Sequence, residues 1–347
     1  MFLFSLYIGH TCTKGHGRWD RMGRDSLDFA WQSCKATGGM RVHSFRKSAS
    51  AIALMALSLL ATSCAPIPRV MTYPEFREIR QPEAPMTLAY GEDALQRVHL
   101  WRPEGKGPFP VAMLIHGGCW QTSVAKADIM SLMAKALAER GVAVWNVEYR
   151  GVDMPGGGYP GTFEDIAGAA DLLAARGREY DLDPRNVLVV GHSAGGHLGL
   201  WLAGRHSIDA ASRLHSESAL SPRGVLSIGG LPNIEALRAV PNHVCGDDTV
   251  DKLVGPVTSD HRHVFADTSP LSLLPLGVPQ MLVSGSQDST APPALAQAYV
   301  ERARAKGDDA MSVTVARQGH FELITPGTRA GDAVIEAALV MLGVARR

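Results

Sequence analysis

The sequence has no excess of charge of either sign, since its 347 residues include 34 lysines and arginines and 34 aspartates and glutamates. Without a basic stripe, nucleic acid is not expected as a partner. The G-x-x-x-x-G-K-[ST] loop that binds nucleotide phosphates and the H-E-x-x-H helix of zinc proteases are both missing. His261 and His263 lie near Asp260, but no fourth ligand follows at zinc-like spacing. We therefore expect neither a metal nor a cofactor.

The N-terminal region lacks an apolar run long enough to span a bilayer, because the run from Ala49 to Ala61 is too short. A basic segment that starts at Met40 precedes this run, and Leu60-Ala61-Thr62-Ser63-Cys64 follows it. This arrangement resembles a bacterial lipoprotein signal, which implies cleavage before Cys64 and a lipid on its thiol. We expect a lipid-anchored protein of the bacterial cell envelope, at the outer membrane or the periplasmic face. An ordinary secretory signal, with a secreted or periplasmic product, is the alternative.

The signal divides the chain into segments. Residues 1–39 have no place in this scheme, and we expect Met40 to be the true start. Residues 40–63 are the expected signal peptide, and residues 64–83 are an expected proline-containing linker. Residues 84–347 then form one catalytic domain, which is long enough for a large core. The oligomeric state is left open.

The most informative motif is Gly191-His192-Ser193-Ala194-Gly195, which directly follows the apolar run Val187-Leu188-Val189-Val190. A buried strand, a sharp turn that carries serine and a small-residue helix are typical of a nucleophile elbow. The glycines leave room around the strained turn. Ser193 is therefore the candidate nucleophile.

A second glycine motif lies upstream, where the apolar run from Val111 to Ile115 leads into His116-Gly117-Gly118-Cys119-Trp120. Acyl transfer needs main-chain N–H groups that already point at the developing oxyanion. We expect these donors to come from Gly117, Gly118 and Cys119 of the loop, and from Ala194 after the nucleophile. A plain glycine turn is the alternative for the loop alone.

Two further side chains follow late strands. Asp288 comes after the apolar run Gln280 to Ser284, and His320 comes after Ser312 to Val315. An aspartate holds a histidine in the tautomer that accepts the serine proton. The order Ser193, Asp288, His320 is the order of α/β-hydrolases. A loop-capping aspartate and a surface histidine are the alternatives.

From about Pro108 to Phe321 the chain resembles the α/β-hydrolase superfamily. Within it, the resemblance is closest to small serine esterases grouped with feruloyl-esterase-like proteins, kynurenine formamidases and prolyl-oligopeptidase-like hydrolases. It implies Ser193, Asp288 and His320 as the triad. Cys119 departs from the pattern, because relatives often carry glycine, tyrosine or phenylalanine there. The matching residues are His116-Gly117-Gly118-Cys119-Trp120, Glu148-Tyr149-Arg150, Tyr159-Pro160 with Asp165, Gly191 to His197, Gly285 with Asp288 and Pro292, and Gly319-His320-Phe321.

The remaining chain alternates strands with helices, which predicts an α/β fold with a mostly parallel central sheet and helices on both faces. We expect helices over 125–140 and over 162–177, the latter capped by Thr162. Residues 231–275 break the alternation and are expected to form a small cap over the active site. A disulfide between Cys119 and Cys245 would tie this cap to the oxyanion loop, and two buried free thiols are the alternative.

These residues predict a serine esterase that cleaves short-acyl or aromatic carboxylic esters through an acyl-enzyme. The expected partner is a small-molecule ester, besides the membrane that holds the lipid anchor. Amide hydrolysis by a formamidase or peptidase with the same triad is one alternative. A lipid-anchored binding protein on an inactive hydrolase fold is the other.

Overall fold

The computed structural model describes residues 69–217 and 219–344. The described residues belong to the unit Ala65–Arg347. The expected signal peptide and the Cys64 lipidation site lie outside the described residues. Among the described residues, no helix combines the length and apolar character needed to cross a membrane.

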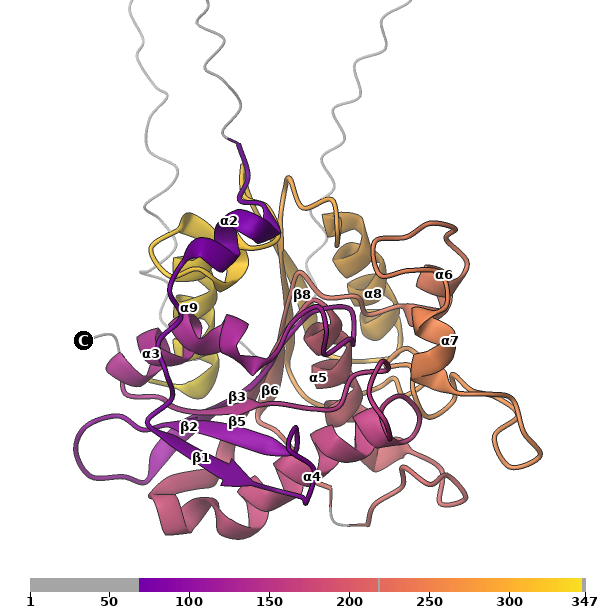
Figure 1. Cartoon of the computed structure of the whole chain (residues 1–347), viewed down its shortest axis with the longest axis horizontal. Coiled ribbons are helices and arrows are strands. Elements are labelled where there is room, and N and C mark those ends of the chain that lie inside the picture. Colours follow the sequence, from indigo (N-terminus) through magenta and orange to yellow (C-terminus); the bar gives the residue numbers. More distant parts are fainter. Residues whose placement is uncertain (1–68, 218, 345–347) are drawn as a thin grey trace, which may run out of the picture. The chain divides into compact units, whose positions relative to one another are not determined.

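An eight-stranded sheet forms the centre of this unit (Figure 1). Its strand order is β1-β2-β4-β3-β5-β6-β7-β8. The first two strands pair antiparallel, as do β2 and β4, and the other neighbours pair parallel. The strands are β1 (Met86–Ala89), β2 (Arg97–Trp101), β3 (Phe109–Ile115), β4 (Ala143–Val147), β5 (Leu182–His192), β6 (Gly224–Ile228), β7 (Gln280–Gly285) and β8 (Ala310–Val315).

Helices cover both faces of the sheet, because its central strands are apolar on both sides. Val111 and Met113 of β3 belong to one buried cluster, and Ala112 and Leu114 belong to the other, as the alternation of side chains along a strand requires. The first cluster includes α4 (Gly161–Arg176), α5 (Ala194–Gly204) and α8 (Pro293–Ala305). The second includes α2 (Tyr73–Glu78), α3 (Ser131–Glu139) and α9 (Arg329–Leu342). The expected three-layer α/β arrangement is confirmed.

Two of the expected helices differ in detail. The first begins as a 3-10 turn, η3 (Ala127–Met130), before α3 continues. The second starts at Gly161, and the expected Thr162 cap is wrong, because Pro160 occupies the cap position without a side-chain hydrogen bond. The Thr162 hydroxyl instead accepts from Gly158 N–H and donates to the Arg150 carbonyl. It therefore fastens the preceding loop to the helix.

The segment expected to be a cap contains two short helices, α6 (Ile234–Arg238) and α7 (Thr249–Val254), joined by irregular chain. The segment expected to be a linker also holds structure. Its helix α2 begins with a capping box between Thr72 and Glu75, and Phe76 is fully buried. Burial of this aromatic side chain holds the described part of the segment on the catalytic unit.

Candidate active site

Ser193 lies at the sharp turn between β5 and α5. Its φ of 54° and ψ of −118° are strained for a residue with a side chain. The flanking glycines are required by close backbone contacts. A Cβ on Gly191 would lie 2.0 Å from the Gly195 carbonyl oxygen, and one on Gly195 would lie 2.1 Å from the Ile115 carbonyl oxygen. The serine therefore projects from a turn that only this glycine pattern permits.

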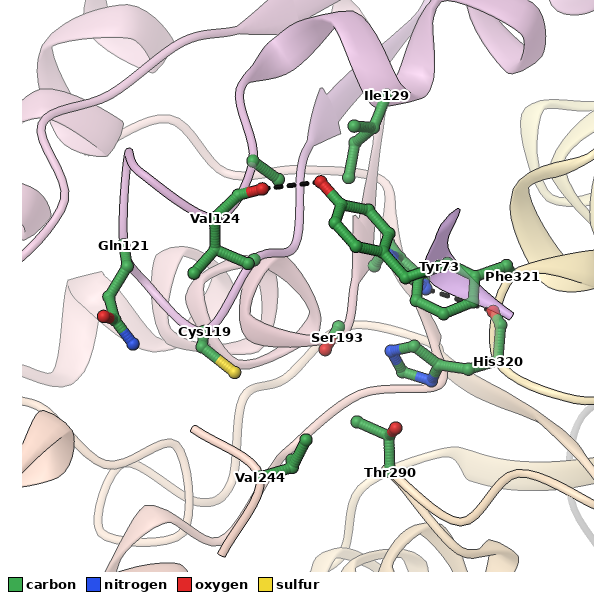
Figure 2. A pocket seen from close by; sticks show the side chains of 13 residues that line it. Tyr73, Cys119, Gln121, Val124, Ile129, Ser193, Val244, Thr290, His320 and Phe321 are labelled. Atoms are coloured by element: carbon green, nitrogen blue, oxygen red, sulfur yellow. Dashed lines mark hydrogen bonds between the residues drawn. The ribbon is translucent and has the colours of Figure 1, made fainter. Parts of the chain in front are cut away.

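His320 and Asp288 form a buried hydrogen-bonded pair. Nδ1 of His320 lies 2.7 Å from Oδ2 of Asp288. The other carboxylate oxygen accepts from the N–H groups of Thr290 and Ala291 at 2.9 and 2.8 Å. Because the carboxylate accepts from Nδ1–H, the unprotonated Nε2 of the neutral ring is left for another partner. Figure 2 shows the imidazole directed toward Ser193.

His192, the residue before the serine, supports this arrangement. Its Nε2–H donates to the main-chain carbonyl of His320 at 3.2 Å, and its ring centroid lies 4.5 Å from that of His320. Burial, and then the nearby His320 ring, lower the pKa of His192 well below its ordinary value. The neutral His192 ring therefore helps to fix the main chain that carries His320.

The loop after β3 takes an unusual backbone path. Gly118, Cys119 and Trp120 all have positive φ, at 101°, 54° and 57°. In the described chain, the N–H groups of Gly118, Cys119 and Ala194 donate to no protein oxygen. Gly118 and Cys119 line the same cavity as Ser193. These N–H groups are therefore candidate donors to an oxyanion formed beside Ser193.

A buried pair of side chains holds the oxyanion loop. Nδ1 of His116 lies 2.7 Å from the Gly117 carbonyl oxygen, and Nε2 lies 3.1 Å from the Glu148 carboxylate. The carboxylate also accepts from Ala127 N–H and Tyr149 N–H. Burial alone would raise the pKa of Glu148, but His116 and these N–H groups lower it on balance. Both His116 nitrogens therefore lie beside oxygen atoms, one of the main chain and one of a carboxylate.

This pairing has a geometric consequence for the next peptide group. The carbonyl of Gly117 and the N–H of Gly118 belong to one peptide unit and point in opposite directions. Fixing the carbonyl on His116 therefore aims the Gly118 N–H the other way. Neither the His116–Glu148 pair nor the role of His192 was visible in the sequence, because each depends on contacts between distant segments.

Cys119 and Cys245 are joined by a disulfide, with Cα atoms 5.2 Å apart. It links the oxyanion loop to the expected cap segment, as the sequence analysis anticipated. Gln121 adds a second link through its side-chain N–H, which donates to the Cys245 carbonyl at 3.0 Å. The loop and the cap are therefore held together on one side of the cavity.

The cavity at this site has a volume of about 180 Å³, below the roughly 300–1,000 Å³ that is typical of sites for drug-sized ligands. Its walls come from the oxyanion loop, the serine turn, the cap, the His320 loop and α2 (Figure 2). The small volume and mostly apolar walls suit a short or narrow apolar group. The lining residues are Tyr73, Gly118, Cys119, Gln121, Val124, Ala125, Ile129, His192, Ser193, Val244, Thr290, His320 and Phe321.

The histidines considered as metal ligands lie elsewhere. Nε2–H of His261 donates to the Asp267 carboxylate at 3.0 Å, and the ring stacks on Tyr159 with ring centroids 3.9 Å apart. Asp267 also accepts from the Tyr159 hydroxyl and from Ser212. These contacts connect the cap to neighbouring loops. In the described ranges, no three His, Cys, Asp or Glu side chains gather as a metal site would require.

Comparison with known proteins supports the same fold. A model of the BD-FAE family matches residues 99–302, more than half of the chain. Esterase LipC of Mycobacterium tuberculosis is 29% identical over 257 residues, which are 72% of this chain and 60% of that protein. Probable carboxylic ester hydrolase LipM of the same organism is 24% identical over 222 residues, 62% of this chain and 51% of that protein. The chain thus spans about half to three-fifths of these relatives' lengths.

Solved structures agree on the architecture. A truncated carbohydrate esterase from gut microbiota has a TM-score of 0.62 at 17% identity and covers 76% of this chain and all of its own. Esterase 2 of Thermogutta terrifontis in its apo form has a TM-score of 0.60 at 17% identity, covering 80% of this chain and all of its own. At such identities the likeness concerns the fold. The chain therefore belongs to the BD-FAE family and has the α/β-hydrolase fold.

Proposed function

We propose that this protein is a serine hydrolase of carboxylic esters. The observation that carries the proposal is the meeting of Ser193, on its strained turn, with the hydrogen-bonded His320–Asp288 pair in one cavity. The esterase names of the LipC and LipM relatives favour an ester as the substrate.

The proposed reaction has two steps. Nε2 of His320 takes the Ser193 proton while Oγ forms a bond to the ester carbonyl carbon. The carbonyl oxygen becomes an oxyanion that accepts from the N–H groups of Ala194 and of the Gly118–Cys119 loop. When the carbon–oxygen bond to the alcohol breaks, His320 returns the proton to the departing alkoxide. Water, deprotonated by His320, then attacks the acyl carbon, the bond to Ser193 Oγ breaks, His320 returns the proton to Oγ, and the acid is released.

The cavity supports a proposal for the substrate class. Its walls include Val124, Ala125, Ile129 and Phe321, and its volume is about 180 Å³. Such a space favours short-acyl or aromatic esters over long-chain ones.

The test is hydrolysis of p-nitrophenyl acetate and butyrate by the wild type and by a Ser193→Ala variant. We expect turnover by the wild type and a loss of about 10⁴-fold or more in the variant. The same samples are offered N-formylkynurenine and aminoacyl amides. Faster turnover of these amides than of the esters would replace the esterase proposal with amide hydrolysis. If folded wild type hydrolyses none of them, the anchored binding protein becomes the better account.

We also propose that the protein is anchored through a lipid on Cys64. The supporting observation is the small-residue sequence Leu60-Ala61-Thr62-Ser63-Cys64 after a short apolar run. In cells of a Gram-negative host, full-length protein is expected in the membrane fraction, and Cys64→Ala is expected to leave that fraction. Equal membrane association of both forms would contradict lipid anchoring.

A further inference from the structure

The helix α2 precedes the residues that the family model matches, yet it reaches the active site. Its first residue, Tyr73, lines the cavity together with Ser193 and His320. The Tyr73 hydroxyl donates to the Val124 carbonyl at 2.5 Å, and its ring centroid lies 5.2 Å from that of Phe321. Tyr73 therefore bridges the loop after β3 and the loop that carries His320.

Other contacts hold this bridge in place. Phe76, one turn along α2, is fully buried and stacks on Phe321 at 5.7 Å. Met71 N–H donates to the Glu322 carboxylate at 2.6 Å, and Arg77 pairs with Asp128 at 2.9 Å. These contacts join both ends of α2 to the catalytic unit. The ring of Tyr73 is thus part of a fixed wall.

The position of the Tyr73 ring in the cavity determines which part of a substrate it can contact. In Figure 2, Tyr73, Val124 and Ile129 lie on one side of Ser193, and Val244 and Thr290 lie on the other. When Ser193 Oγ adds to the ester carbonyl, the carbon becomes tetrahedral, and its two arms, the acyl chain and the alcohol, extend in different directions. The Tyr73 ring lies on a side of Ser193 where one of these arms can extend, within the cavity that both residues line.

We propose that Tyr73 is a specificity-determining residue, whose ring limits the length of the ester arm that lies against α2. This inference rests on the proposed ester hydrolysis. It predicts that a smaller side chain at this position admits longer arms, and that a larger one restricts the site to the shortest substrates.

The experiment measures kcat/KM for two series of esters. In the first, p-nitrophenyl esters run from acetate to octanoate, so that only the acyl arm grows. In the second, acetate esters of linear alcohols from ethanol to octanol vary only the other arm. The variants are Tyr73→Ala, Tyr73→Phe and Tyr73→Trp, and Arg77→Ala serves as the matched control because it alters α2 without lining the cavity.

In one series, Tyr73→Ala is expected to raise the ratio of long-chain to short-chain kcat/KM by about fourfold for each methylene that enters the freed space. Tyr73→Trp is expected to lower that ratio, and Tyr73→Phe and Arg77→Ala are expected to keep it near the wild-type value. A change in cavity size moves the ratio in opposite directions in Tyr73→Ala and Tyr73→Trp. A general loss of folding would lower the activity of both variants without this opposition.

Two failures are distinguishable. If the wild type hydrolyses esters and neither series changes its ratio in Tyr73→Ala and Tyr73→Trp, the role of Tyr73 is wrong and the esterase proposal stands. An equal change in Arg77→Ala would also contradict the role of Tyr73, since any disturbance of α2 would then suffice. If folded wild type hydrolyses no ester, the proposed function itself fails.

Discussion

Asp288 accepts from Nδ1 of His320 through one carboxylate oxygen, while its other oxygen accepts from the main-chain N–H groups of Thr290 and Ala291. The two carboxylate oxygens therefore have different hydrogen-bond partners and different roles. One is committed to the loop that follows β7, and the other sets the tautomer of the histidine. An amide in place of this carboxylate cannot perform both duties with the same ring tautomer.

Asp288→Asn is the variant that tests this relationship. The amide oxygen is expected to remain on the N–H groups of Thr290 and Ala291, which turns the NH₂ group toward His320. The ring must then accept at Nδ1 and carry its proton on Nε2, where it can no longer take the Ser193 proton. We expect kcat to fall by about 10⁴-fold with the fold unchanged by circular dichroism. A loss below about tenfold would contradict the assigned role.

Glu148→Gln tests the support of the oxyanion loop. Loss of the carboxylate charge weakens the hold on His116, and with it the direction of the Gly118 N–H. Because an oxyanion donor acts in the transition state, kcat is expected to fall by about tenfold or more while KM changes little.

A control for this variant is Asp153, which lies with Glu148 in the loop after β4. Asp153→Asn alters a carboxylate that accepts from Thr122 N–H and Ser123 N–H, away from the oxyanion peptides. It is expected to leave kcat within about threefold of the wild type, well short of the loss of one oxyanion donor. A rise in KM at constant kcat for Glu148→Gln would refute the proposed positioning.

The disulfide between Cys119 and Cys245 encloses a long segment, since 126 positions separate the two residues. Reduction is expected to lower the free energy of unfolding by up to about 5 kcal/mol, the chain-entropy value for a loop of this length, because the unfolded chain is less constrained. Urea unfolding with and without dithiothreitol measures this change. A Cys119→Ser, Cys245→Ser double variant should be as unstable as the reduced wild type and insensitive to the reductant. An unchanged midpoint for reduced wild type would contradict the prediction.

Buried histidines make stability depend on pH. His197 accepts from Trp120 Nε1–H at Nδ1 and contacts the Thr268 carbonyl through Nε2. Burial lowers its pKa to about 4. The unfolded chain, with a histidine pKa of about 6.5, binds the proton first, so stability is lost as pH falls from about 6.5 to about 4.

For His197 alone, the free energy of unfolding is expected to fall by about 2 kcal/mol between roughly pH 7 and pH 5. The lowered pKa of His192 acts in the same direction. Urea unfolding at both pH values measures the loss. His197→Gln keeps a polar side chain that does not titrate, and the pH-dependent loss is expected to be smaller in this variant by about that amount. An equal loss in the variant and in the wild type would show that His197 does not carry it.

Much of the sheet was predictable because its strands are short apolar runs. The expected runs Val111 to Ile115 and Val187 to Val190 lie fully buried in β3 and β5. The same pattern located Ser193, Asp288 and His320 at the carboxyl edge of the sheet. Their catalytic roles stay predictions until the variants are measured.

Features that depend on distant contacts were not predictable. The helix α2 is only six residues long and lies among prolines, so no periodicity marks it. Tyr73 lines the cavity through contacts with distant segments, among them the packing of its ring against Phe321 near the other end of the chain. Similarly, Thr162 had the sequence of a helix cap but bonds to the preceding loop, because the tertiary position of Arg150 offers its hydroxyl an acceptor.

The most direct test of the account concerns the reactivity of Ser193. Purified protein is treated with a fluorophosphonate and its intact mass is measured, beside a Ser193→Ala variant treated in the same way. The account predicts a single adduct on the wild type and none on the variant, since only a serine activated by His320 attacks the reagent at neutral pH. Absence of an adduct on folded wild type, or an equal adduct on both proteins, would contradict it.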